Sequence, residues 1–268
     1  MKYNVNFHET FPITFEYISK ILEISNGNRE YSKKEISNIT GIPTGLQSGK
    51  VVPHIEYARY MNLINYKKNK GSYVLTRTEL GEIIYNEDPY LTESLTYKLL
   101  NYFLTSFNYG AEMWSFFYKE LMKQYNGEMT KAILLKEMQK KYGEKVKIAP
   151  LFNSYKNNLD KLNVIKIDSK DEIIKIEKKI EIDATYVYAY CLLSEWEKAF
   201  TDIEITINQL NKIYWKEGFN LSSSDEFCVL SLLEEKNILK LNKQLSPMTI
   251  IKLKNSQEYL EKIYSLLI

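Results

Sequence analysis

One order of helical and β-forming segments recurs along this 268-residue chain, and the recurrence constrains the fold more than any other feature. In the first copy, a capping box opens a short helix at Ser32 that ends at Gly41. A longer helical pattern follows over 48–62, and β-forming runs at 63–66 and 72–75 flank a lysine-rich turn. The order of helix, helix and hairpin is typical of a winged helix-turn-helix module.

The same order returns in the middle of the chain. Helical patterns over 130–142 and 150–162 precede β-forming runs at 164–167 and 173–176, and these runs flank a second charged turn. The repeat predicts tandem modules.

A third and weaker copy closes the sequence. Helices are predicted over 184–200, 203–214 and 224–237, and strands are predicted at 238–241 and 249–253. Its wing is less well marked than the wings of the first two copies.

The predicted fold class is mainly α (α+β), built from tandem winged helix-turn-helix modules with small β-hairpin wings. The first module is expected to occupy 1–126, the second 127–183, and a helical, winged-helix-like C-terminal module 184–268. The first module includes an aromatic-rich segment over 95–125. Its aromatic residues recur at helical spacing, which favours a place in the core over a platform for stacking bases.

Positive charge is concentrated in two parts of a chain whose formal net charge is only +2. Residues 29–77 contain nine Lys and Arg but three Asp and Glu, and residues 128–166 contain nine and four. Such segments create a local field that favours polyanions. A solvated charged surface is the alternative interpretation of each lysine cluster.

The first copy carries residue types that suit the recognition of double-stranded DNA. In a winged helix, the third helix enters the major groove while basic wing residues contact phosphates. Lys and Arg contact guanine or phosphate, and Gln pairs with adenine. The predicted DNA-binding residues are Lys33, Lys34, Gln47, Ser48, Lys50, His54, Arg59, Lys67, Lys68 and Lys70. The alternative is a winged helix that is used for protein contacts.

Cysteine and histidine usage indicates no cofactor, no metal and no nucleophilic catalysis. Cys191 and Cys228 are well separated and have no histidine nearby, which argues against a disulfide framework and a zinc finger, so both are interpreted as buried thiols. His8 and His54 are the only histidines, and neither lies in a nucleophile motif. No signal peptide or membrane span is evident, so a cytoplasmic protein with no membrane partner is expected.

A metal-dependent nuclease is the remaining enzymatic hypothesis. It would need converging carboxylates to hold Mg²⁺ and activate water. The nearest candidates are Asp160, Asp168 and Glu177, which fall on a predicted helix and hairpin where solvation of a charged wing is the simpler interpretation.

The N-terminal segment places His8 and Glu9 between the apolar residues Phe7 and Phe11. We interpret His8 and Glu9 as a structural hook that hydrogen-bonds to the N-terminal module. A contact with DNA or with a partner protein is the alternative. A metal site would need further ligands that the sequence does not offer.

Short motifs follow one another through the chain in a distinctive order. They include "FHETFP", "IEYARYMNLI", "TELGEIIYNEDPYLTES", "MWSFFY", "IAPLFNSY", "YVYAYCLLSEW" and "FCVLSLLEE". Over essentially its full length the chain resembles a bacterial domain family of unknown function, encoded beside DNA phosphorothioate-modification genes and in related phage-defence clusters. The resemblance implies that sulfur-transfer chemistry belongs to neighbouring gene products, which include a cysteine desulfurase and a phosphoadenosine-phosphosulfate-reductase-like enzyme.

Three functions follow from these observations. The first is a non-enzymatic DNA-binding protein of a DNA-modification or phage-defence system. The second is a scaffold that docks a sulfurtransferase or another defence enzyme, and the third is a metal-dependent nuclease.

Overall fold

The computed structural model describes residues 4–45 and 49–267. Within them, three small antiparallel sheets each hold three strands, in the orders β1-β3-β2, β4-β6-β5 and β7-β9-β8. In every sheet the first strand in the chain pairs with the last, and the last pairs with the middle one. Each sheet lies within one of the three predicted segments, although the domain boundaries themselves stay a prediction.

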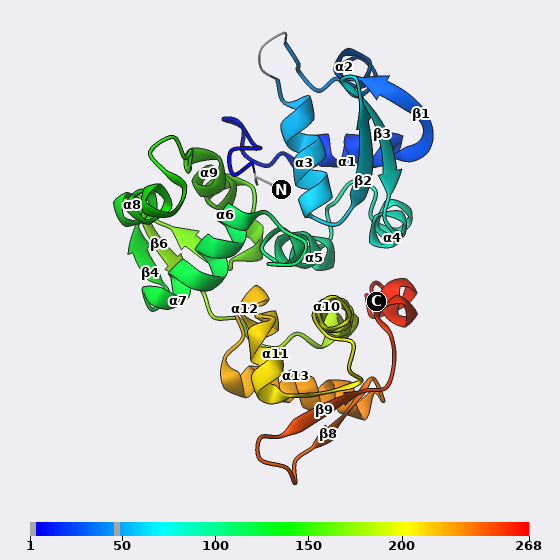
Figure 1. Cartoon of the computed structure of the whole chain (residues 1–268), viewed down its shortest axis with the longest axis vertical. Coiled ribbons are helices and arrows are strands. Elements are labelled where there is room, and N and C mark those ends of the chain that lie inside the picture. Colours follow the sequence, from blue (N-terminus) through cyan, green and yellow to red (C-terminus); the bar gives the residue numbers. More distant parts are fainter. Residues whose placement is uncertain (1–3, 46–48, 268) are drawn as a thin grey trace.

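The first sheet and its helices form one end of the molecule (Figure 1). Their bounds are α1 Phe15–Ile24, β1 Asn26–Ser32, α2 Lys33–Thr40, α3 Val51–Tyr60, β2 Ile64–Asn69, β3 Ser72–Arg77 and α4 Glu79–Glu87. A central helical segment follows, with α5 Ser94–Leu104, α6 Glu112–Ser115, the π-helix η1 Phe116–Leu121 and α7 Met122–Gln124.

The second and third sheets repeat the order of strand, helices and hairpin. The second unit contains β4 Glu128–Thr130, α8 Lys131–Tyr142, α9 Ala149–Asn157, η2 Asp160–Leu162, β5 Ile165–Ile167 and β6 Glu172–Lys175. The third unit begins with η3 Ile182–Ala184 and α10 Thr185–Ala199. It continues with β7 Glu204–Thr206, α11 Ile207–Lys212, α12 Trp215–Gly218, α13 Ser223–Glu235, β8 Leu239–Asn242, β9 Thr249–Lys252 and η4 Ser256–Lys262.

The mixed α+β class and both well-marked hairpins agree with the sequence prediction, but the first strand of each sheet was missed. β1 escaped the sequence prediction because its sequence NGNREYS has no apolar alternation and its pairing is supplied by β3. β7 lies inside the helix predicted over 203–214. The helix there begins only after Thr206, whose hydroxyl and Gln209 form a capping box.

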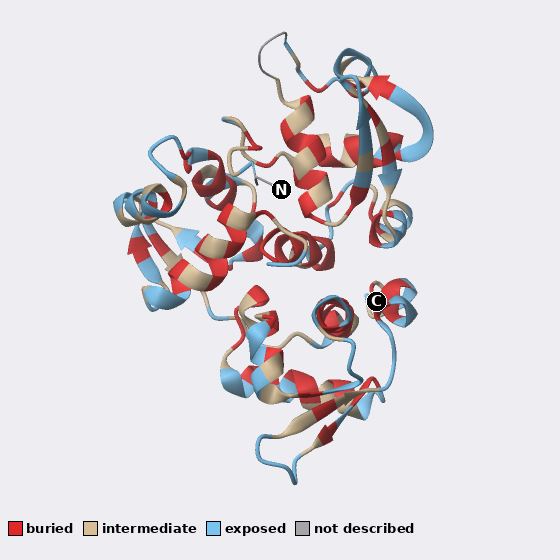
Figure 2. Ribbon diagram, viewed as in Figure 1, coloured by how far each residue is buried: buried red, intermediate tan, exposed pale blue. Residues whose placement is uncertain are grey.

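The aromatic-rich segment lies in the core, as predicted. Phe103, Trp114, Phe117 and Tyr118 are all buried, whereas Phe107 is 43% exposed. The segment packs between the three units, and α10 of the third unit, buried along most of its length, lies against α5 (Figure 2). No helix among the described residues has the length and apolar character that a membrane crossing requires.

One of the two cysteines differs from its predicted state. Cys191 on α10 is a buried thiol, as expected, but Cys228 is exposed. Cys228 follows the exposed Phe227 on α13, so both lie on the outer face of that helix, whereas Val229 and Leu230 face the core.

The N-terminal segment fastens the first unit to the second. The Phe7 ring packs on Tyr57 and Tyr60 of α3, with ring centroids 5.0 and 4.7 Å apart. On the other side, the Asn6 side chain accepts a hydrogen bond from the backbone N–H of Lys147 and donates one to the carbonyl of Lys145. These contacts give the segment the character of a hook, but neither His8 nor Glu9 makes them.

Candidate nucleic-acid interface

Five exposed lysines lie at one end of the first sheet. Strand pairing brings them together, because Ser72 at the start of β3 pairs with both Ser32 on β1 and Asn69 on β2. The start of α2 and the β2–β3 turn therefore lie at the same end of the sheet (Figure 1). We call this group the lysine edge, and it consists of Lys33, Lys34, Lys67, Lys68 and Lys70.

The hairpin that presents the lysine edge is tighter than the predicted five-residue tip. Lys67 and Lys68 belong to β2, and the turn itself consists of Lys70 and Gly71. Both turn residues have positive φ, 45° and 93°, as the two central residues of a type I′ hairpin turn require. A short turn holds the lysine backbones close to the end of the sheet.

Among the described residues, none of the five lysines lies within ion-pair distance of a carboxylate. The neighbouring carboxylate of Glu35 accepts a 2.7 Å hydrogen bond from the backbone N–H of Ser32, and this bond lowers the pKa of Glu35. The Lys68 ammonium lies 5.4 Å from the centroid of the Tyr73 ring. The lysine edge is therefore a cluster of exposed positive charge on a fixed backbone.

Helix α3 is not a free recognition helix. Every residue from Val51 to Tyr60 is buried or half-buried (Figure 2), because α1, α2, α5 and the N-terminal segment pack around it. A helix that reads the major groove needs one face open to DNA along several turns. Helix α3 offers only a half-buried stripe of Val52, Glu56 and Arg59, and the last two side chains are paired with each other.

The burial of α3 changes the interpretation of His54. Its ring is fully buried, its Nδ1 lies 2.6 Å from the carbonyl oxygen of Lys50, and its edge packs on Tyr17. Desolvation lowers the pKa of His54 to about 4. We therefore remove His54 from the proposed interface, because no part of the ring reaches the surface.

Arg59 and Lys50 are held by other protein groups. The Arg59 guanidinium pairs with Glu56 at 2.8 Å and lies 3.9 Å from the centroid of the Tyr60 ring. The Lys50 ammonium lies 5.3 Å from the centroid of the Tyr17 ring, at the entry to α3. Gln47 and Ser48 lie outside the described residues.

His8 is also fully buried. Its Nδ1 lies 3.4 Å from the carbonyl oxygen of Glu9, which has a positive φ of 53°. Desolvation lowers the pKa of His8 to about 4.

The two buried histidines predict a loss of stability in mild acid. Each pKa is lowered from 6.5 to about 4 on folding, so the unfolded chain takes up protons first as the pH falls below 6.5. We expect each histidine to reduce the free energy of unfolding by about 2–3 kcal/mol between pH ~7 and ~4.5. Urea unfolding at both pH values measures the loss, and His8→Gln should remove one histidine's share of it. An unchanged pH dependence in that variant would contradict the assignment.

Sequence patterns gave no sign of an interior charge cluster formed by Lys119, Glu195 and Glu217. Lys119 lies on the π-helix η1 and is fully buried, and its ammonium has no hydrogen-bond partner among the described residues. Glu195 on α10 is fully buried and accepts one hydrogen bond from Asn108, and one buried oxygen of Glu217 has no partner among the described residues. Burial lowers the pKa of Lys119, and the charges of the two carboxylates oppose that shift.

A single lysine in an aromatic helical pattern is a weak sequence signal for a buried charge, and Lys119 falls on a π-helical turn. A π-helical turn shifts the residues that follow it by about one position relative to an α-helix, and such turns are frequent at functional sites. The ammonium of Lys119 lies 5.3 Å from the centroid of Tyr102 and 5.6 Å from that of Phe107. The cluster thus joins the central segment to the third unit.

Two of the three acidic residues named for a nuclease, Asp168 and Glu177, make local contacts in the structure. Asp168 accepts hydrogen bonds from the backbone N–H groups of Lys170 and Glu172 and so stabilises the β5–β6 turn. Glu177 lies 3.6 Å from the ammonium of Lys179. Across 4–45 and 49–267, no group of three or more His, Cys, Asp and Glu side chains is arranged to hold a metal ion.

Comparison with known proteins shows that solved structures share the fold of this chain. No family model and no curated protein matches the chain. Two solved structures share its architecture: an SspB structure, with a TM-score of 0.75 and 15% identity, and a magnesium ion-bound SspB structure, with a TM-score of 0.72 and 14% identity. Each comparison covers 96% of this chain and 86% of the other. The shared architecture therefore extends over nearly the whole chain.

Proposed function

We propose that the chain is a non-enzymatic, DNA-binding component of a bacterial DNA-phosphorothioation or phage-defence system, and that its three units are winged-helix modules. The order of strand, two helices and hairpin in each unit supports the module assignment. The observation that carries DNA binding is the lysine edge, with its five exposed ammonium groups free of carboxylates in the described structure. The motif resemblance and the fold shared with SspB support the biological setting.

The lysine edge suits phosphate better than bases. Exposed lysines neutralise backbone phosphates and release counterions, and this interaction carries no sequence information. Helix α3, which would have to read the major groove, exposes only a half-buried stripe in which Glu56 and Arg59 pair with each other. The chain therefore binds double-stranded DNA with little dependence on sequence, and any sequence choice in a modification complex comes from another subunit.

Binding to two unrelated duplexes of equal length tests this function. Fluorescence polarisation with duplexes of about 30 base pairs should give affinities within about threefold of each other at low salt. A third duplex, with phosphorothioate linkages, tells whether the chain acts before or after modification. Absence of binding to all three at low salt would overturn the proposal and favour a protein-docking scaffold.

Magnesium-dependent cutting of DNA is the second candidate, because one structure of the same fold is described as magnesium ion-bound. Supercoiled plasmid incubated with the purified chain separates the two candidates. Relaxed or linear products with Mg²⁺ but not with EDTA would contradict the non-enzymatic part of the proposal while leaving DNA binding intact.

A further inference from the structure

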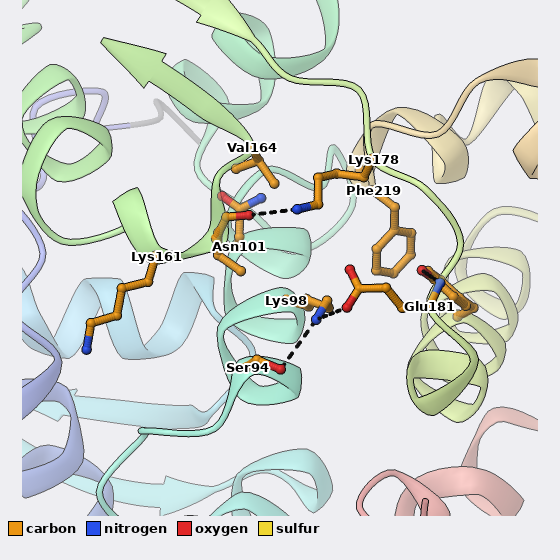
Figure 3. Close-up of a pocket in the computed structure, with 11 residues that line it drawn as sticks. Ser94, Lys98, Asn101, Lys161, Val164, Lys178, Glu181 and Phe219 are labelled. Carbon is orange, nitrogen blue, oxygen red and sulfur yellow. Dashed lines mark hydrogen bonds and ion pairs between the residues drawn. The ribbon is translucent and has the colours of Figure 1, made fainter. Parts of the chain in front are cut away.

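A cavity of about 210 Å³ lies where the three units meet (Figure 3). The central helix α5 forms one side, residues 161–164 of the second unit form another, and α10 and the end of α12 close it from the third unit. The segment that connects the second and third units passes its mouth with Lys178 and Glu181. The cavity therefore has walls from every part of the chain.

Two lysines of the cavity, Lys98 and Lys178, differ in whether a carboxylate neutralises them. Lys98 pairs with Glu181 at 2.9 Å, so these two charges largely cancel. Lys178 has no carboxylate within ion-pair distance among the described residues, and its ammonium contacts only the carbonyl oxygen of Leu162, at 3.4 Å. That distance is long for an N–H···O bond, whose usual value is about 2.9 Å. One positive charge at the cavity is thus left without a strong partner.

Lys161 is also close, but its side chain points away from Lys98 and Lys178 (Figure 3). Lys161 belongs to the lining of the cavity but is exposed on the surface of the second unit. Lys161 therefore offers a matched lysine of the same lining whose ammonium points away from Lys178 (Figure 3).

Part of the remaining lining is apolar, and its aromatic ring is held by other rings. Phe219 stacks on Tyr102 at 4.8 Å and meets the edge of Tyr188 at 4.9 Å, so its ring is fixed in position. Leu162 and Val164 line the cavity as well. The Tyr188 hydroxyl oxygen accepts a hydrogen bond from the backbone N–H of Glu181, and its own proton has no acceptor among the described residues. The cavity combines a flat apolar surface, a hydroxyl donor and an unpaired ammonium.

We propose that this cavity binds a small organic oxyanion, a carboxylate or phosphate carried on a single apolar or aromatic ring. The ring packs beside Phe219, and the oxyanion accepts hydrogen bonds from Lys178 and from the Tyr188 hydroxyl. The volume is below the roughly 300 Å³ at which drug-sized pockets begin, which limits the ligand to about one ring. The site is separate from the lysine edge, so it goes beyond the proposed function.

Calorimetric titration of the full chain with four probes tests the ligand chemistry. Benzoate and phenyl phosphate carry both ring and oxyanion, inorganic phosphate carries only the oxyanion, and benzyl alcohol carries only the ring. We expect at least one of the first two to bind at least tenfold more tightly than the last two, because both halves of the site are then used. Equal affinity for inorganic phosphate would overturn the role of the ring, and no heat from any probe would overturn the site.

Three variants test whether the probe binds in this cavity. Two of them should change the affinity in opposite directions. Lys178→Met should weaken the probe that binds by about tenfold, because a charge-assisted hydrogen bond is lost. Glu181→Gln should strengthen it, since Lys98 then becomes free to contact the oxyanion. Lys161→Met should leave binding unchanged. Equal affinity in the Lys178→Met and Lys161→Met variants, with both folded by circular dichroism, would refute the site.

Discussion

Lys119→Met should lower the free energy of unfolding by about 1–3 kcal/mol, because it leaves the fully buried Glu195 carboxylate without a compensating positive charge. Methionine fills nearly the same volume, so the loss comes from charge rather than from a cavity. Without Lys119, the fully buried Glu195 keeps one hydrogen bond from Asn108 but loses its favourable charge interaction with the ammonium. Chemical denaturation followed by circular dichroism measures the difference.

The charge origin of this loss has its own test. Adding Glu195→Gln to Lys119→Met removes the uncompensated carboxylate, so the double variant should regain part of the lost stability. Lys123→Met is the matched control, because Lys123 follows η1 in the same helical segment but is exposed, and its effect should stay within about 0.5 kcal/mol. A Lys119→Met protein as stable as the natural one would show that the ammonium contributes nothing to joining the units.

Reversing the charge of the β2–β3 hairpin should weaken duplex binding by about 100-fold or more at low salt. The triple variant Lys67→Glu, Lys68→Glu and Lys70→Glu removes three of the five ammonium groups at the lysine edge and places three carboxylates against the phosphates. Fluorescence polarisation with a labelled duplex gives the affinity. These side chains are exposed, so the fold should remain intact in the variant.

A second triple variant controls for total charge. Lys212, Lys236 and Lys240 are exposed on the third unit and lie within ion-pair distance of no carboxylate in the described structure. Changing all three to Glu alters the net charge by the same amount at another place. Binding should then fall less than tenfold, and equal losses in both triple variants would mean that DNA responds to overall charge rather than to the lysine edge.

Local sequence signals predicted much of the fold. The capping box at Ser32 and Glu35 forms as expected and starts α2. The hairpins follow β-forming runs, because alternation and turn residues are local properties. The first strand of each sheet escaped prediction because its pairing depends on a partner far along the chain, as β1 depends on β3.

The candidate nucleic-acid interface was only partly predictable, because burial also depends on contacts between residues far apart in the sequence. The lysines of the hairpin and of α2 are polar in sequence and exposed in the structure, so composition sufficed to find them. His54 and Arg59 looked equally suitable, but the N-terminal segment and the central helices cover α3, and no local pattern reports that packing. Lys119 contrasts with the exposed lysines of the hairpin, because tertiary contacts bury it although its residue type suggests exposure.

The salt dependence of duplex binding tests the central claim most directly. With five phosphate-neutralising lysines, the logarithm of the binding constant should fall with the logarithm of salt concentration with a slope of about −4.5. Changing Lys67, Lys68 and Lys70 to Gln should reduce that slope to about −1.8, since two lysines of the edge remain. An unchanged slope in the Gln variant, with natural affinity, would contradict the account, because the chain would then hold DNA through another surface.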